Sequence, residues 1–236
     1  MLSIEKNKQL KQSNLITNSR YSMTAVEMNI IFLLIAQLKK DDPVDRVYQI
    51  SVKELEAAAG SKINYGRLKD YTFKLRNRGY EIENKEGYLQ IGICASVEYI
   101  KQSGVLEIEI ARKLRPFLFD LKDNFTTYSL KNVLKVKGTY AKRFFQMFCM
   151  WQSTGKFVVK IEELKYKLDL IDRVKGEEKY AKYGMFKKKV IDVALKEINE
   201  NTDFDIGFDE YKTGRRITKL IFTINHKNSI PIVEDS

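Results

Sequence analysis

The chain has 236 residues, of which 44% are hydrophobic and 31% are charged, and it contains only 3 prolines. This composition describes one large or two small folded domains and excludes a disordered or fibrous chain. The 42 basic and 31 acidic side chains leave a net charge of +11, which favours a polyanionic partner.

The few cysteines and histidines exclude several kinds of site. Cys94 and Cys149 lie in apolar stretches and His226 is the single histidine, whereas a zinc site needs three or four such ligands. The longest apolar run, residues 30–36, is far shorter than the ~20 residues that span a bilayer. We therefore predict a cytoplasmic protein with no metal and no membrane partner.

The first strong helix signal begins at Thr24. Thr24 and Glu27 form the capping-box pattern, and the following residues, "AVEMNIIFLLIAQLKK", are apolar nearly all round. This helix is therefore predicted to be buried on several sides. An extended segment at 46–50 then leads into a second helix, which opens with the same capping pattern at Ser51 and Glu54 and stops at a glycine.

Residues 64–79 form a predicted amphipathic helix. Its apolar side carries Leu68, Tyr71, Thr72 and Leu75, and its other side carries Arg67, Lys74 and Arg78. The side-chain period then changes to two, so residues 80–100 and 104–111 are predicted strands, with a hairpin turn at 85–87. A helix, a strand, two helices and a β-hairpin, in this order, are typical of a winged helix.

The second half of the chain repeats this order. A long helix at 139–154 precedes "KFVVKIEELKYKLDL", an extended segment with a helix after it; "GMFK" then echoes the earlier "GRLK", and a hairpin follows with its turn at 212–214. The offset grows from 109 residues, for Leu55 and Leu164, to 118 residues, for Gly66 and Gly184, which indicates an insertion near 173–181. Short patterns of this kind also recur by chance, but four elements in the same order favour a true repeat. We predict an α+β fold with two tandem winged-helix domains, 1–125 and 126–236.

Catalytic motifs are missing from the sequence. One histidine cannot supply the metal-binding histidine pair of a nicking enzyme, and neither "GxxxxGK[ST]" nor "GxSxG" occurs. The carboxylate pairs at 162–163 and 177–178 are expected to be solvated surface. We predict no enzymatic activity, no catalytic residue and no cofactor.

Basic side chains occur where a winged helix contacts DNA, at its recognition helix, its wing and its bracing helices. In the second half, the recognition helix would begin with Lys182, Lys187, Lys188 and Lys189; the wing would carry Lys212, Arg215 and Arg216; and the long helix would begin with Lys137, Thr139, Lys142 and Arg143. Free backbone N–H groups at the start of that long helix would also hold a phosphate. The first half offers Lys62, Arg67, Lys74 and Arg78. Any one cluster is more often a solvated face, but three clusters at the three expected places favour DNA binding.

The two halves differ in charge. Residues 1–125 contain 20 basic and 16 acidic residues, whereas residues 126–236 contain 22 and 15. The second domain is therefore predicted to be the main DNA reader, and the first to supply backbone contacts or self-association. Self-association rests on the very apolar helix at 24–38, for which a buried core helix is the alternative.

Several segments in order resemble the Rep family of plasmid replication initiators. They are "NLITNSRYSMTAVEMNIIFLLIAQL", "LRPFLFDLKDNFTTYSL", "KRFFQMFCMWQSTGKFVVKIEELKYKLDL" and "FKKKVIDVALKEINENTDFDIGFDEYKTGRRITKLIFTI", and together they cover most of residues 14–225. The resemblance implies two winged-helix domains that bind directly repeated sites, called iterons, in double-stranded DNA at a plasmid origin. It also implies a homodimer in equilibrium with a monomer, recruitment of a host initiator or helicase, and repression of the protein's own gene.

On this resemblance, the recognition helix maps to 182–189 and the wing to 212–216, and the equivalent helix of the first domain carries Arg67, Lys74 and Arg78. Two other functions remain open from the residues. The same side chains would serve a two-domain transcriptional regulator without a replication role. A protein-interaction module would leave the basic clusters unexplained.

A helical wheel separates the three adjacent lysines of the second recognition helix. At 100° per residue, the buried arc would contain Phe186, Val190, Val193, Ala194 and Ile198. Lys187 falls inside this arc, whereas Lys188 and Lys189 point outward. We therefore expect Lys188 to be the first of the three to reach DNA.

Overall fold

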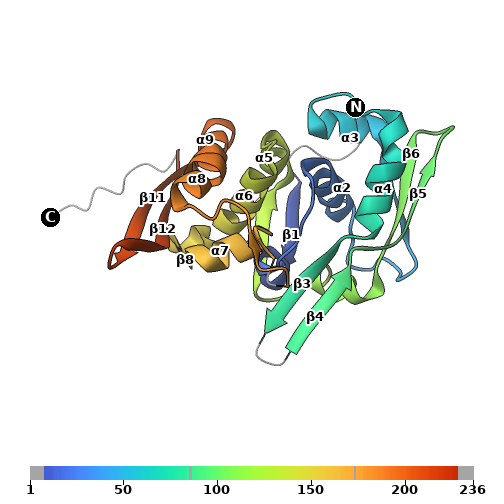
Figure 1. Ribbon diagram of the computed structural model, residues 1–236. Coiled ribbons are helices and arrows are strands. Elements are labelled where there is room, and N and C mark those ends of the chain that lie inside the picture. Colours follow the sequence, from blue (N-terminus) through green and yellow to red (C-terminus); the bar gives the residue numbers. More distant parts are fainter. Residues whose placement is uncertain (1–7, 85–86, 173, 228–236) are drawn as a thin grey trace.

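The computed structural model describes residues 8–84, 87–172 and 174–227, and Figure 1 shows two groups of helices and strands that follow one another along the chain. The first group contains β1 (Gln9–Ser13), α1 (Asn14–Asn18), α2 (Ala25–Ile35), β2 (Val47–Ser51), α3 (Val52–Ala59), η1 (Tyr65–Arg67), α4 (Leu68–Arg76), β3 (Gly79–Asn84), β4 (Gly87–Gly92), β5 (Cys94–Ile100), β6 (Val105–Ile110) and η2 (Arg112–Phe117). The second contains β7 (Phe125–Ser129), α5 (Leu130–Lys135), α6 (Thr139–Trp151), η3 (Gln152–Thr154), β8 (Lys156–Lys160), α7 (Ile161–Lys167), β9 (Ile171–Asp172), β10 (Glu177–Glu178), α8 (Tyr183–Phe186), the π-turn η4 (Lys187–Ile191), α9 (Asp192–Asn201), β11 (Phe204–Thr213) and β12 (Arg216–His226).

The predicted helix starts are confirmed. Thr24 and Glu27 exchange both hydrogen bonds of a capping box at the start of α2, and Ser51 and Glu54 do the same at α3. Helix α3 ends at Gly60, whose φ of 71° lies in the left-handed region that glycine adopts without strain.

The sheets confirm the internal repeat and the α+β fold. One three-stranded sheet has the order β2-β6-β5 and the other has the order β11-β12-β8. In the first sheet, β2, which precedes α3, pairs with β6, the last strand of its hairpin. In the second, β8, which precedes α7, pairs with β12, the last strand of the wing hairpin. The small hairpin β9–β10 lies in the segment where the sequence indicated an insertion.

The prediction for the first wing was wrong. Strands β3 and β4 form a separate two-stranded sheet, whereas the counterpart of β11–β12 is the hairpin β5–β6, with its turn at 101–104. Of the predicted turn at 85–87, Lys85 and Glu86 lie outside the described residues, and Gly87 pairs with Asn84. Both hairpins alternate with period two, so periodicity could not tell which one joins the three-stranded sheet.

The second wing turns slightly later than predicted. Thr213 pairs with Arg216, which leaves Gly214 and Arg215 as a two-residue loop instead of a turn at 212–214. Gly214 has a φ of 63° at the first central position, where a tight hairpin favours glycine. The hairpin also has a register shift between Tyr211 and Lys212, which leaves Thr218 without a partner residue in the ladder.

Helix α2 is a core helix. Every residue from Glu27 to Ile35 is buried, and α2 packs against α3, α5 and α6. The buried alternative is therefore confirmed for this helix, and it offers no exposed apolar face for self-association.

The two halves share a buried polar joint. Strand β1 pairs with β7, and the buried side chains of Gln12, Thr17, Thr126 and Gln146 form hydrogen bonds with one another or with Tyr128. Because these side chains come from both halves, the joint links them through contacts that satisfy its buried polar groups. The proposed boundary between residues 125 and 126 falls just inside the start of β7.

Lys142 and Arg143 belong to this interior, which corrects the prediction that they face DNA. Lys142 is 0% exposed, and its Nζ donates to the carbonyl of Val133 at 2.8 Å. Arg143 is 2% exposed and donates to the carbonyls of Ser19 and Lys167. Backbone carbonyls distant in sequence thus compensate two charges that the local pattern suggested were at the surface.

Burial of Lys142 should make stability depend on pH. Burial lowers the pKa of its ammonium from 10.5 to about 7. The folded state therefore binds fewer protons than the unfolded state between pH 7 and 10.5, so stability should rise with pH in that window. Relative to Lys142→Met, the free energy of unfolding of the natural protein should increase by about 1.4 kcal/mol per pH unit. Urea unfolding between pH 6.5 and 9.5 measures this, and a difference independent of pH would contradict it.

Candidate DNA-binding surface

The second recognition helix is α8, the π-turn η4 and α9 in succession. Its buried side chains are Phe186, Val190, Ile191, Ala194, Leu195 and Ile198. Val193, which the helical wheel placed in the buried arc, is 57% exposed, so that prediction was wrong.

The π-turn explains this difference. A π-turn closes i→i+5 hydrogen bonds and therefore adds one residue to its turn of helix. Residues after 191 are set back by one position, or about 100°, relative to a regular α-helix. This rotation moves Val193 to solvent and turns Leu195, which is 6% exposed, toward the core.

Glu210 of β11 fastens the start of this helix to the wing. Its Oε1 accepts hydrogen bonds from the hydroxyl of Tyr183 at 2.7 Å and from Nζ of Lys187 at 2.9 Å. The ammonium of Lys187 also lies 5.2 Å from the centre of the Phe208 ring. The hydrogen bond from Lys187 lowers the pKa of Glu210, and the same bond raises the pKa of Lys187. Lys187 is thus held against the protein's own wing, whereas the sequence predicted it as one of the DNA contacts.

The other predicted basic residues of the second recognition helix and wing are exposed. They are Lys182, Lys188 and Lys189 on the helix, and Lys212, Arg215 and Arg216 on the wing. The wing hairpin extends past the sheet, because β12 pairs with β8 only from Lys219 to Thr223. A helix start and a projecting hairpin, both basic, are the two parts with which a winged helix approaches a duplex.

Two backbone N–H groups just before α6 are bonded to an acidic side chain of the protein itself. The carboxylate of Glu197, from α9, accepts hydrogen bonds from the backbone N–H of Lys137 and of Gly138. Nζ of Lys137 donates to the carbonyls of Leu134 and of Ala58 at the end of α3. A carboxylate of the protein itself therefore lies beside the predicted phosphate site, and Thr139 at the helix start is half-buried.

In the first half, the predicted residues separate into exposed and paired ones. Arg67 and Lys74 are exposed on the first recognition helix, η1–α4, and Lys62 is exposed with Glu56 at 3.4 Å. Nε of Arg78 lies 3.4 Å from the fully buried carboxylate of Glu27, so this arginine compensates a buried charge. Lys101, at the tip of the true first wing, is exposed and was missed. The preceding β5 pattern and the glycine at 104 could have indicated that tip.

Both recognition helices begin with the same short motif. Tyr65-Gly66 in the first half corresponds to Tyr183-Gly184 in the second, and Leu68 and Phe186 each follow two residues after the glycine and are fully buried. Gly184 lacks a positive φ, and a Cβ there would meet nothing within 4 Å. Neither backbone conformation nor packing within the protein therefore requires this glycine.

Within the described ranges, no group of three or more His, Cys, Asp or Glu side chains could hold a metal ion. None of the helices in those ranges is both long enough and apolar enough to cross a membrane.

Two helix-and-wing units in one chain define a tandem winged-helix protein. Residues 9–149 match the family described as Initiator Replication protein, WH1, and residues 160–224 match Initiator Rep protein, WH2. The chain therefore belongs to the replication initiator (Rep) family, which confirms the resemblance noted in its sequence.

Similar proteins cover nearly the whole chain. It is 24% identical to the PI protein of Escherichia coli over 94% of this chain and 84% of that protein. It is 23% identical to an uncharacterized 27.6 kDa protein of Escherichia coli over 92% and 96% of the two chains. The crystal structure of the Pi initiator protein in complex with iteron DNA has the same fold, with a TM-score of 0.80 at 21% identity over 96% of this chain and 100% of that one.

The bond between Lys187 and Glu210 should be visible in a titration. The carboxyl of Glu210 should titrate below its ordinary pKa of 4.5, because Lys187 and Tyr183 donate to its charged form. Removing the ammonium in Lys187→Met should raise this pKa, which ¹³C NMR of the side-chain carboxyl measures. Lys196→Met, which changes an outward lysine near Glu200, is the control and should leave it unchanged. The same pKa in Lys187→Met and in the natural protein would contradict the contact.

Proposed function

We propose that this chain initiates plasmid replication by binding directly repeated double-stranded sites, iterons, at the origin, and that it represses its own gene through the same contacts. It acts as a DNA-binding protein and not as an enzyme. The observation that carries the proposal is the repetition of an exposed basic recognition helix and wing within one chain. The likeness of its fold to the Pi initiator protein, which was crystallised in complex with iteron DNA, supports it.

Each half contributes a recognition helix to the major groove. In the second half, Lys188 reads a base edge, Lys182 and Lys189 contact phosphates, and the wing residues Arg215 and Arg216 contact the backbone or minor groove. The first half adds Arg67 on η1 and Lys74 on α4, with Lys62 before them and Lys101 on the wing. Four of the predicted residues form internal contacts that stabilise the fold: Arg78, Lys137, Lys142 and Arg143. Lys187 holds the recognition helix in place.

Two partner assignments accompany this function. We propose that a homodimer exchanges with the monomer, and that the DNA-bound protein recruits a host initiator or helicase. Sedimentation at several concentrations tests the first, because a dimer equilibrium depends on protein concentration.

Footprinting on the DNA that flanks the gene tests the main proposal. The full chain should protect several direct repeats of roughly 20 base pairs, since two recognition helices together cover about two turns of duplex. An adjacent AT-rich segment supports initiation. Protection of one inverted repeat at a promoter would instead indicate a regulator without a replication role.

Lys188 and the wing should differ in what they contribute to binding. Lys188→Ala should cost about 1–3 kcal/mol and relax the preference at one base pair. Arg216→Ala should weaken binding to all DNA sequences alike. It should also reduce the slope of log K against log salt concentration by about one unit. Lys156→Met, which removes one positive charge from an exposed position on β8, is the matched control and should leave the slope unchanged. Fluorescence anisotropy on a panel of single-base variants measures this, and an equal loss at every sequence for Lys188→Ala would refute base reading.

Gly184 should separate stability from binding. Gly184→Ala should stabilise the fold by about 0.5–1 kcal/mol, because alanine favours a helix and its Cβ enters open space. DNA affinity should nevertheless fall, since a side chain there would stand between the helix start and the base edges. Gly207→Ala on β11, where the Cβ also meets nothing, is the control. Thermal unfolding and anisotropy give the two values, and unchanged DNA affinity would contradict a close approach at Gly184.

A further inference from the structure

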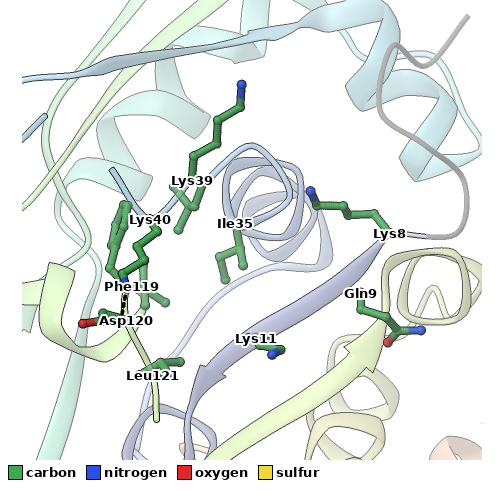
Figure 2. A pocket seen from close by; sticks show the side chains of 11 residues that line it. Lys8, Gln9, Lys11, Ile35, Lys39, Lys40, Phe119, Asp120 and Leu121 are labelled. Carbon is green, nitrogen blue, oxygen red and sulfur yellow. Dashed lines mark ion pairs between the residues drawn. The ribbon is translucent and has the colours of Figure 1, made fainter. Parts of the chain in front are cut away.

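A lysine-rimmed pocket lies where β1, the end of α2 and residues 118–121 meet (Figure 2). Its volume is about 310 Å³, within the size range of small-ligand sites. The apolar side chains that line it are Ile35, Leu38, Leu118, Phe119 and Leu121. Lysines stand on both sides of Ile35, with Lys39 and Lys40 on one side and Lys8 on the other.

The strand register places this pocket away from the first wing. In the sheet β2-β6-β5, Ser51 pairs with Val105 beside the wing turn, whereas Val47 pairs with Glu109 at the opposite end. Residues 39–40 precede β2, which begins at that opposite end. Residues 118–121 follow β6, which ends there. The carbonyl of Asp42 accepts a hydrogen bond from Arg115 at 2.5 Å, which ties these two segments together.

The charges around the pocket are unbalanced. Asp120 is the acidic residue in its lining, and it lies 3.4 Å from Lys40. Lys11 stands over the ring of Phe125 at 5.0 Å. Neither Lys8 nor Lys39 has an ion pair with an acidic side chain in the part of the chain that the structure describes. The site therefore has more positive charge than it neutralises, and it lies toward the end of the sheet opposite the first wing turn.

The apolar floor decides which polyanion fits. A nucleic-acid backbone presents phosphates and small sugar rings and has no bulky apolar side chain to fill such a floor. A peptide can present an apolar side chain between acidic neighbours, so that the floor takes the anchor and the lysine ammoniums face the carboxylates. A buried anchor with charged surroundings is the arrangement in which an interface concentrates its binding energy.

We propose that this pocket is a docking site for an acidic segment of a partner protein with one bulky apolar side chain among its carboxylates. Lys8, Lys11 and Lys39 face the carboxylates, and the anchor lies against Leu38 and Phe119. The site is separate from the DNA-binding surface, so one chain can hold both partners at once.

A labelled peptide tests this site on the full chain. The probe is fluorescein-DEDESFDED, with fluorescein-DEDESSDED as the probe without an anchor, and binding is followed by anisotropy. The first peptide should bind at least about five-fold more tightly than the second, because only the first fills the floor. Lys39→Glu and Lys8→Glu should each weaken it roughly five-fold. Lys156→Glu, the same charge change on β8, is the matched control and should have no comparable effect.

The affinity of the same variants for DNA is the second measurement of this test. Lys39→Glu should leave affinity for duplex DNA, selected from a random pool by the natural protein, within about two-fold. If Lys39→Glu weakens DNA binding and leaves peptide binding unchanged, the pocket serves nucleic acid and the proposal is overturned. Equal binding of both peptides, or equal loss in Lys156→Glu, would also overturn it, since either result means non-specific attraction. Melting temperatures establish that each variant is folded.

Discussion

The guanidinium of Arg143 is the contact on which the arrangement of the two halves depends. It extends from α6 and donates to the carbonyls of Thr17 and Ser19 in the first half and of Lys167 in the second. Its centre lies 3.7 Å from the middle of the Tyr21 ring. A buried charge is tolerated only where such partners surround it. One side chain on α6 is thus hydrogen-bonded both to the α1 region of the first half and to α7 of the second.

The recognition helix depends on a second internal contact. Glu210 holds Tyr183 and Lys187 at the start of the helix, and the π-turn beyond them resets its phase. These two features divide three adjacent lysines into one that positions the helix and two that remain at the surface. A π-turn within a helix is often retained because it serves a functional site.

Local sequence rules predicted what local interactions determine. The capping boxes at Thr24 and Ser51 and the left-handed Gly60 could be recognised because their partners are within a few residues. The order of elements likewise repeated visibly. Burial of Lys142 and Arg143 could not be recognised, because the carbonyls that compensate them belong to residues 9 to 126 positions away. The π-turn depends on packing between elements, as does the pairing of β5–β6, and not β3–β4, with the three-stranded sheet. A regular 100° helical wheel and a strand period of two carry no information about such packing.

The contact between Glu197 and the start of α6 joins the second recognition helix to the rest of the molecule. Glu197 lies on α9 and accepts from the backbone N–H of Gly138, which precedes α6. Nζ of the neighbouring Lys137 donates to a carbonyl near the end of α3 in the first half. The second recognition helix is therefore tied by hydrogen-bonded side chains to α3, the helix that precedes the first recognition helix. If both recognition helices enter the groove as proposed, the chain measures the spacing and the rotational phase between its two half-sites. One inserted base pair would turn the second half-site by about 34–36° around the duplex axis. The hydrogen bonds of Glu197 and Lys137 would resist the matching rotation of the second recognition helix.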